Sequence, residues 1–334
     1  MSYLPNELIL EVIEALIPPR SSRIYSPEHP VTRTLVSLTL TSKLTHQAAR
    51  RLLLTFCLHI NSSKKLDNLL DVNVDTTSES NPPIQPRSLF LAPFPSYNIA
   101  EPHIVRQVDR LFSQASASLR TLVINIPLRS LYPNEDDQGL RKIVRGAFCR
   151  LTALEEFCSA QDELYCDALT TGDEPAVWTL WPRLKKLALY NACLDPSFVQ
   201  GLQGCPNLTH VVFTRADCVL ESLPENVTST LPWPSLKRVI IVNTHEDHTR
   251  EVRRREAGWE TSFVGWLSRG QRTTPPEDHD YQNLEPLVSL ITVPIPVGKE
   301  GNDIEVCQEW VCSHALDGSL WDFPNDLLGS YGLW

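Results

Sequence analysis

Two histidines with two carboxylates between them lie in the segment His245-Glu246-Asp247-His248. Imidazoles three residues apart on a helix, flanked by acidic side chains, could share a metal ion. The zinc-protease pattern H-E-x-x-H needs histidines four residues apart, however, and no third ligand is identifiable. A solvated turn after the apolar run that ends near Asn243 is the favoured interpretation. A metal enzyme or hydrolase that uses His245 and His248 is the alternative, and we expect no metal and no cofactor.

The nine cysteines form no recognised metal or disulfide pattern. No C-x-x-C pair occurs. The pattern Cys307-x4-Cys312-x-His314 has poor spacing for zinc, and it lies on the apolar side of an expected helix. Buried thiols are the simpler interpretation there and at Cys158 and Cys166. An odd number of cysteines without a disulfide scaffold favours a reducing compartment.

Common enzyme signatures are missing from the sequence. It contains no G-x-S-x-G, no G-x-x-x-x-G-K-[ST] and no G-x-G-x-x-G, and its 13 glycines leave few phosphate-binding loops. The run Arg253-Arg254-Arg255 lies among Arg250, Glu251 and Glu256, which favours local ion pairing on a helix over phosphate recognition. We therefore expect a protein that is not itself an enzyme.

Charge and hydropathy limit the classes of partner. The net charge is -10 and the pI is near 5.4, whereas nucleic-acid binders normally carry a basic surface, so we expect no nucleic-acid partner. No apolar run approaches the about 20 residues of a membrane-spanning helix, and no signal peptide is recognisable. We expect a cytoplasmic or nuclear protein with no membrane partner.

The first sixty residues predict a three-helix unit. Residues 4–16, LPNELILEVIEAL, repeat apolar side chains at helical spacing, and Pro18-Pro19 ends this helix before a polar stretch that runs to about Pro30. A shorter element and a third helix with Ser42 or Thr41 at its start follow, and an apolar strand-like run lies at 57–60. The residues that mark these two elements are Leu35, Leu38, Leu40, Leu44, Ala48 and Leu52.

An irregular repeat follows the three-helix unit. Five segments begin with a leucine, and four of them continue as L-x-x-φ-x-φ, where φ is apolar, a spacing typical of strands with one buried face. The segments are 118–126, 153–160, 183–191, 207–215 and 235–243. Apolar helical stripes lie between them, at 104–112, 140–151 and 196–202, where Asp195-Pro196 suits a helix start. Stacked strand and helix units of about 24–35 residues are similar to leucine-rich repeats.

The end of the sequence breaks this pattern. We expect a helix around Phe263 and Trp266, an edge strand at 289–296 because of its prolines, and a last helix from Ile304 to His314. Together they are interpreted as a terminal cap of the repeat array. Polar stretches near 73–87 and 270–283 predict surface loops.

The N-terminal pattern Leu4-Pro5-x-Glu7-Leu8-Ile9-x-x-Val12-Ile13-x-x-Leu16 resembles the first helix of F-box domains. The pattern Leu38-x-Leu40-x-Ser42-Lys43 resembles the second half of that motif. The whole chain resembles fungal F-box proteins, with an F-box-like module at 1–60 and an irregular leucine-rich-repeat-like domain at 61–334. By this resemblance the fold class is α/β, and the partners are a Skp-type adaptor of the SCF ubiquitin ligase and an unknown target protein. The residues implied in adaptor docking or its support are Leu4, Pro5, Leu8, Ile9, Ile13, Leu35, Leu38 and Leu40.

Basic side chains at the x positions of the repeat strands are the candidates for target binding. A solvated face is the default interpretation, but on one aligned surface these groups could attract an acidic or phosphorylated target. They are Arg120, Lys185, Lys186, His210, Lys237 and Arg238.

Two features of the sequence depart from the F-box pattern. A long insertion at 18–30 separates the first two helices, and Thr45 stands where an aromatic residue is often found. They leave open a second hypothesis, that of an interaction scaffold which recruits no ligase.

Overall fold

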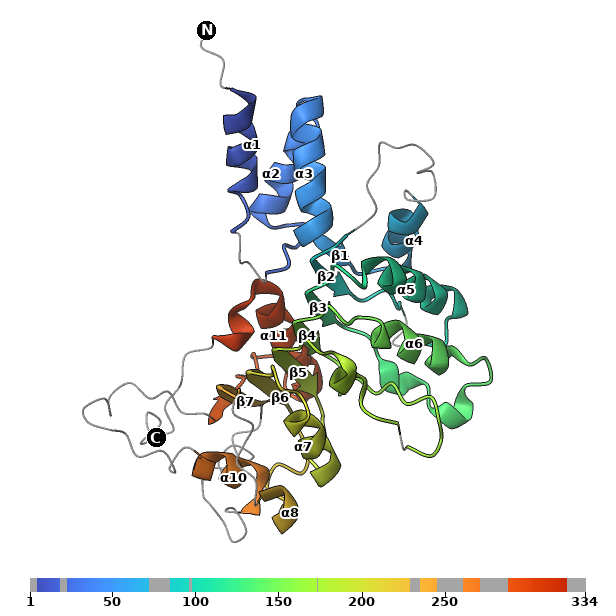
Figure 1. The fold of residues 1–334 in the computed structure, drawn as a ribbon, viewed down its shortest axis with the longest axis vertical. Helices are drawn as coiled ribbons and strands as arrows, with labels where there is room; N and C mark the ends of the chain where they lie inside the picture. Colours follow the sequence, from blue (N-terminus) through green and yellow to red (C-terminus); the bar gives the residue numbers. More distant parts are fainter. Residues whose placement is uncertain are drawn as a thin grey trace, which may run out of the picture.

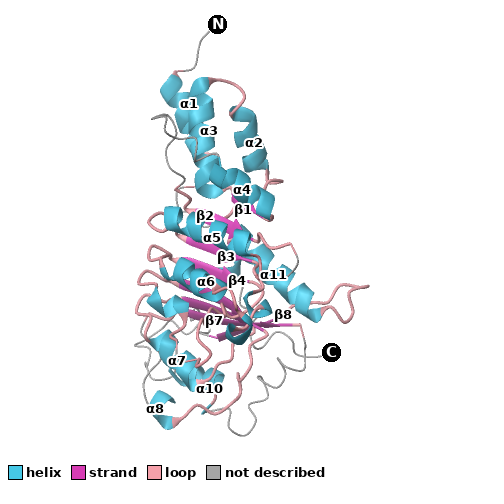
Figure 2. Ribbon diagram, turned by 90° about the vertical axis from the view of Figure 1, so that its right-hand side faces the viewer, coloured by secondary structure: helices cyan, strands magenta, loops and turns pink. Residues whose placement is uncertain are grey.

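The fold consists of three helices at one end and a parallel sheet with flanking helices (Figures 1 and 2). It was obtained as a computed structural model, which describes residues 5–18, 23–71, 85–95, 98–172, 174–228, 235–244, 261–270 and 288–322. The α/β class predicted from the sequence is confirmed.

The three N-terminal helices are α1 (Asn6–Glu14), α2 (Pro30–Leu38) and α3 (Lys43–Phe56). The α3 helix starts at the predicted cap, because the Ser42 hydroxyl accepts a hydrogen bond of 3.2 Å from the backbone N–H of Thr45. The helices bury a cluster of their own, so they form a unit with a separate core. Its buried members are Ile13, Ile17, Tyr25, Leu35, Ala49 and Leu52.

Eight strands of the described residues form one sheet in which each strand pairs in parallel with the next strand along the chain. They are β1 (Leu58–Ile60), β2 (Ser88–Leu91), β3 (Thr121–Ile124), β4 (Glu156–Ser159), β5 (Lys186–Tyr190), β6 (His210–Thr214), β7 (Arg238–Asn243) and β8 (Val288–Thr292). The five predicted repeat strands correspond to β3 to β7. The predicted last strand is β8, which lies at the edge of the sheet as expected. The sequence did not predict β2.

One face of the sheet carries the main core. Strand residues in register, such as Leu122, Phe157 and Leu187, point to this face and are fully buried. Helices cover it, namely α4 (Ser63–Asp71), α5 (Pro102–Ala115), α6 (Leu140–Cys149), α7 (Pro196–Gln203), α8 (Glu225–Thr228) and α10 (Phe263–Gly270). Aromatic rings in contact, from Trp178 through Phe198 and Phe213 to Phe263, connect successive units of this core.

The opposite face is covered by α11 (Asp303–Asp317) (Figure 2). Val123, Cys158 and Ala188 lie in register on this face, and Val306 and Val311 of α11 belong to the same buried cluster. The sequence placed this last helix in a terminal cap, which is wrong: α11 contacts β3 and β4 in the middle of the sheet. The physical reason is that all residues of β3 and all but the first of β4 are buried, on both faces of the sheet, and parallel sheets need cover on both.

The segment before α2 joins the three-helix unit to α11. The backbone N–H of Ile24 donates to the Leu316 carbonyl at 2.8 Å, and the Arg23 Nε donates to the Asp317 carbonyl at 2.9 Å. Ile24 is buried in the core under α11, whereas the next residue, Tyr25, is buried in the core of the three helices. The predicted insertion at 18–30 therefore contains the link between the two cores.

The loops that follow β3 and β4 are held by the buried side chain of Arg141 on α6. Its guanidinium donates to the carbonyls of Leu128, Leu131, Tyr165 and Asp167 and lies 4.4 Å from the centre of the Tyr165 ring. A charged side chain that is only 2% exposed needs such complete pairing.

We expect Arg141→Met to lower the free energy of unfolding by about 3 kcal/mol or more, because it leaves buried carbonyls without donors. Arg150→Met is the matched control, since Arg150 pairs with Asp109 at the surface and is expected to change stability by less than about 1 kcal/mol. Urea unfolding of the two variants measures both values, and equal losses would contradict the role assigned to Arg141.

Candidate functional site

The three-helix unit exposes large apolar side chains on two helices and on the turn that follows the second of them. On α1, Leu8 is 45% exposed and Val12, one turn later, is 62% exposed. Val36 on α2 is 48% exposed, and Leu40 in the turn after α2 is 84% exposed. None of these four side chains belongs to the core of the unit. Apolar groups gathered on one small unit mark a candidate docking surface, and we call these four residues the apolar docking set.

The residues predicted for adaptor docking divide into three groups. Pro5, Leu8 and Leu40 are exposed, whereas Ile9 and Leu38 are half-buried against the core of the helices. Ile13 and Leu35 are 2% and 0% exposed, so they support the helices from inside. Leu4 lies outside the described residues.

The sequence prediction did not include Val12 and Val36 among the docking residues. The spacing of four residues between Leu8 and Val12 places both on one side of α1, and this spacing was the available signal. The spacing does not tell which side of α1 meets α3, and packing against α3 buries the side that carries Ile13.

A depression of about 340 Å³ adjoins Leu40 in the turn between α2 and α3. It is lined by residues 39–43 with His46 and Gln47. The ring Nδ1 of His46 lies 2.9 Å from the Thr39 carbonyl, and the hydroxyls of Thr41 and Thr45 lie 2.6 Å apart. These contacts hold the turn in the conformation that exposes Leu40.

Three of the predicted target-binding residues lie in register on the sheet face that carries α11. Lys186 on β5 pairs with His210 on β6, which pairs with Arg238 on β7. Trp321, which follows α11, covers this row: its ring lies 5.7 Å from the Lys186 Nζ, and its carbonyl accepts a hydrogen bond of 3.5 Å from Arg238.

The charge of this row is small at neutral pH. The Lys186 Nζ lies 3.1 Å from the Glu156 carboxylate. Burial, followed by the charge of Lys186, lowers the pKa of His210 to about 4, so the imidazole is neutral. Arg238 is only 7% exposed. The structure thus brings these three residues together, but the segment that follows α11 covers them.

The other three predicted residues, Arg120, Lys185 and Lys237, each lie one residue before a strand. Arg120 donates to the Ala153 carbonyl at 2.7 Å, and Lys185 lies 2.6 Å from the Glu155 carboxylate. Lys185 and Lys237 are exposed at this edge. The six candidates therefore form two separate rows, and acidic residues are interleaved with the cations in both.

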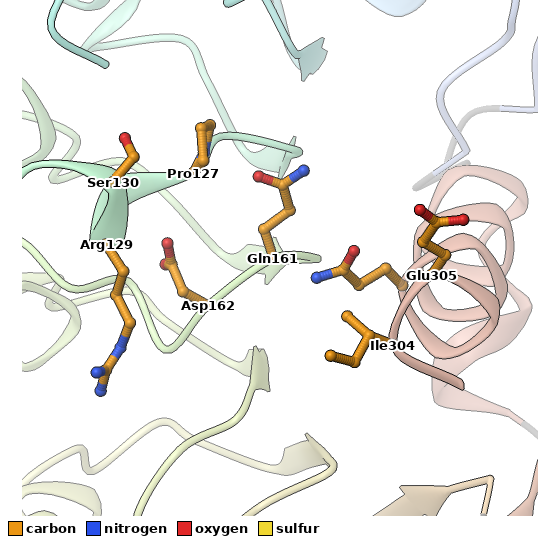
Figure 3. A pocket seen from close by; sticks show the side chains of 8 residues that line it. Pro127, Arg129, Ser130, Gln161, Asp162, Ile304 and Glu305 are labelled. Carbon is orange, nitrogen blue, oxygen red and sulfur yellow. The ribbon is translucent and has the colours of Figure 1, made fainter. Parts of the chain in front are cut away.

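A pocket of about 380 Å³ lies where β3 and β4 end, beside the start of α11 (Figure 3). It is lined by residues 127, 129 and 130 of the loop after β3, by residues 161 and 162 of the loop after β4, and by residues 304, 305 and 308 of α11. In Figure 3, Ile304 projects from α11 into the space in front of the loop that carries Gln161 and Asp162. The sequence did not predict this pocket, because it depends on where α11 lies.

Asp162 is the buried acid of this pocket. Its carboxylate accepts hydrogen bonds from the backbone N–H groups of Leu128 at 2.8 Å and Leu164 at 2.9 Å. Burial nevertheless raises the pKa of Asp162 to about 7, and the charge of Glu163 adds to the rise. The carboxyl organises the two loops, and its proton is exchangeable near neutral pH.

Comparison with known proteins identifies no family. No protein-family model matches the chain, and no curated protein matches it. The described residues contain no group of three side chains that could hold a metal ion, and no described helix is long and apolar enough to cross a membrane. The segments 245–248 and 253–255 lie outside the described residues.

The free energy of unfolding is expected to depend on the protonation of Asp162. Because the folded state raises its pKa from 3.8 to about 7, folding is favoured by this proton below pH about 4, and the contribution is lost as the pH rises through 7. At about 1.4 kcal/mol per pKa unit, the loss amounts to roughly 4 kcal/mol. Urea unfolding of the wild type and of Asp162→Asn between pH 4 and pH 8 measures this contribution to the free energy of unfolding. If the free energy changes with pH in the same way in both proteins, Asp162 makes no such contribution.

Adjacent residues of α1 are expected to respond differently to truncation. Ile13→Ala removes a buried side chain and should lower the free energy of unfolding by about 3 kcal/mol. Val12→Ala removes an exposed one and should change it by less than about 0.5 kcal/mol. Thermal or urea unfolding measures the difference, and a large loss for Val12→Ala would place Val12 in the core instead.

Proposed function

We propose that the chain is the substrate receptor of an SCF-type ubiquitin ligase. The three-helix unit, an F-box-like module, docks a Skp-type adaptor, and the sheet unit holds a target protein. The observation that carries the proposal is the apolar docking set, Leu8, Val12, Val36 and Leu40, on a unit whose own core is complete without it.

Helix-in-groove recognition explains how such a surface would bind. Apolar side chains one helical turn apart enter a groove on the partner, and their removal from water supplies most of the binding energy. Leu8 and Val12 have this spacing on α1. Ile13 and Leu35 on the inner side hold α1 and α2 in place, so little conformational freedom is lost on binding.

The sheet unit is proposed to be an irregular leucine-rich-repeat-like solenoid. Strands that pair in the order of the chain, each with apolar residues toward a shared core, support this interpretation. Because α11 and Trp321 cover one face, the exposed cations at the amino ends of the strands, Lys185 and Lys237, are the proposed contacts with an acidic or phosphorylated target.

The receptor itself would catalyse no reaction. Its contribution would be proximity, because a target held beside the transferring enzyme experiences a high effective concentration of that enzyme. The fixed link from the three helices through Ile24 to α11 supports this role, since it limits how far the two units can move apart.

Adaptor binding by the double variant Leu8→Asp, Val12→Asp tests the proposal. Two carboxylates in an apolar interface should weaken binding to a purified Skp-type adaptor by at least about 30-fold in calorimetry. Leu40→Asp is a second variant and should weaken binding in the same direction. Ile13 is unsuitable for this purpose, because a charge in the buried core would unfold the helices.

Val297→Asp is the matched control, because Val297 is 99% exposed and lies far along the chain, between β8 and α11. It should bind the adaptor as the wild type does. Circular dichroism establishes that all variants are folded. Wild-type affinity in the double variant would refute the docking surface. A folded wild type that binds no adaptor would instead be a scaffold that recruits no ligase.

A further inference from the structure

The turns after β5 and β6 bring two cysteines together. Cys193 forms an isolated parallel bridge with Asp217, the residue before Cys218. The backbone N–H of Asp217 donates to the Ala192 carbonyl at 2.9 Å, and that of Leu194 donates to the Asp217 carbonyl at 3.1 Å. The two turns are thus fixed to each other by backbone hydrogen bonds on both sides of Cys193.

This backbone geometry suits a disulfide. Paired strands lie about 4.8 Å apart and one residue advances about 3.3 Å, so the Cα atoms of Cys193 and Cys218 are separated by about 6 Å. Disulfides join Cα atoms that are about 4.4–6.8 Å apart. Cys218 has a φ of 63°, in the left-handed region, so its side chain does not follow the regular alternation of a strand.

The two thiols also interact with each other. The Cys193 thiol is the main cause that raises the pKa of the Cys218 thiol to about 12, and burial and the Glu221 carboxylate add to the effect. Cys193 itself is exposed to solvent. The thiols of Cys158, Cys166, Cys205 and Cys307 are buried, so an oxidant in solution reaches them less readily than it reaches Cys193.

We propose that Cys193 and Cys218 form a thiol–disulfide switch that closes on reaction with a hydroperoxide. Solvent-exposed Cys193 reacts first: its thiolate attacks a peroxide oxygen, the O–O bond breaks, and a sulfenic acid and one water form after proton uptake. The Cys218 sulfur then attacks the sulfenic sulfur. The S–S bond forms, the S–O bond breaks, and the hydroxyl leaves as a second water with the Cys218 proton. Two thiols and one hydrogen peroxide thus give one disulfide and two waters.

The bond would enclose α7 and β6, which lie between the two cysteines in the chain. A closed loop lowers the conformational entropy of the unfolded chain, so the oxidised protein is more stable than the reduced one. Transient disulfides of this kind occur in reducing compartments as redox sensors, where thiol exchange reopens them. The switch lies in the sheet unit and does not depend on adaptor docking.

Peptide mapping of the full chain after treatment with hydrogen peroxide and alkylation of the remaining thiols tests the switch. Trypsin yields residues 187–215, which contain Cys193 and Cys205, and residues 216–237, which contain Cys218. We expect these two peptides to be joined, with fragmentation that assigns the bond to Cys193. A dithiol reductant should separate them. A bond from Cys205, or alkylation of both Cys193 and Cys218 after oxidation, would overturn the proposal.

Thermal unfolding gives a second measurement that needs no peptide assignment. Peroxide should raise the melting temperature of the wild type by about 5 °C and should leave that of Cys193→Ser unchanged. Cys57→Ser is the matched control, because Cys57 is half-buried in the three-helix unit, and it should respond as the wild type does. An equal rise in Cys193→Ser, or no rise in the wild type, would refute the switch.

Discussion

Register between neighbouring parallel strands is the constraint on which the rest of the structure depends. Because β3 to β7 align residue for residue, their alternate side chains form rows on both faces of the sheet. Both rows are apolar: Leu187 and Val211 point to one face, and Ala188 and Val212 point to the other. Burying a large apolar side chain contributes about 1.5–3 kcal/mol. The stacked helices cover the first face, and α11 must cover the second.

The position of α11 then determines how the three-helix unit is attached. The end of α11 presents the carbonyls of Leu316 and Asp317, which receive donors from Ile24 and Arg23. Ile24 adds its side chain to the core under α11, while Tyr25 enters the other core. Two adjacent residues thus belong to two different cores, and a hinge at this point would expose one of them. The apolar docking set consequently has a fixed orientation relative to the sheet.

Much of this fold could be predicted from the sequence because local spacing determines it. The L-x-x-φ-x-φ spacing identified β3, β5, β6 and β7, the leading leucine Leu154 marked the segment of β4, and Ser42 and Asp195 identified the starts of α3 and α7. The strand β2 has the sequence Ser88-Leu89-Phe90-Leu91, in which three consecutive apolar residues hide the period of two. Similarly, the apolar side of α11 shows that the helix is buried on that side, but not which surface it packs against. The location of the pocket at Asp162 could not be predicted for that reason.

The candidate sites show the same limit. A period of two places Lys186, His210 and Arg238 on one face, which is correct, yet Trp321, more than 80 residues further along the chain, decides that they are covered. On α1, helical spacing separates Leu8 and Val12 from Ile13, but only the packing of α3 shows that Ile13 is the inner residue.

The distribution of exposed apolar and charged groups explains why binding is assigned to the three helices first. Nine large apolar side chains of the described residues are exposed, and four of them form the apolar docking set on the smallest unit of the molecule. At the edge of the sheet, by contrast, Glu155 lies between Arg120 and Lys185 and contacts both. Charges paired in this way remain hydrated and offer a partner little energy. Apolar groups exposed on a rigid helix gain energy from any groove that removes them from water. The docking set is therefore the part of the surface where a protein partner gains most.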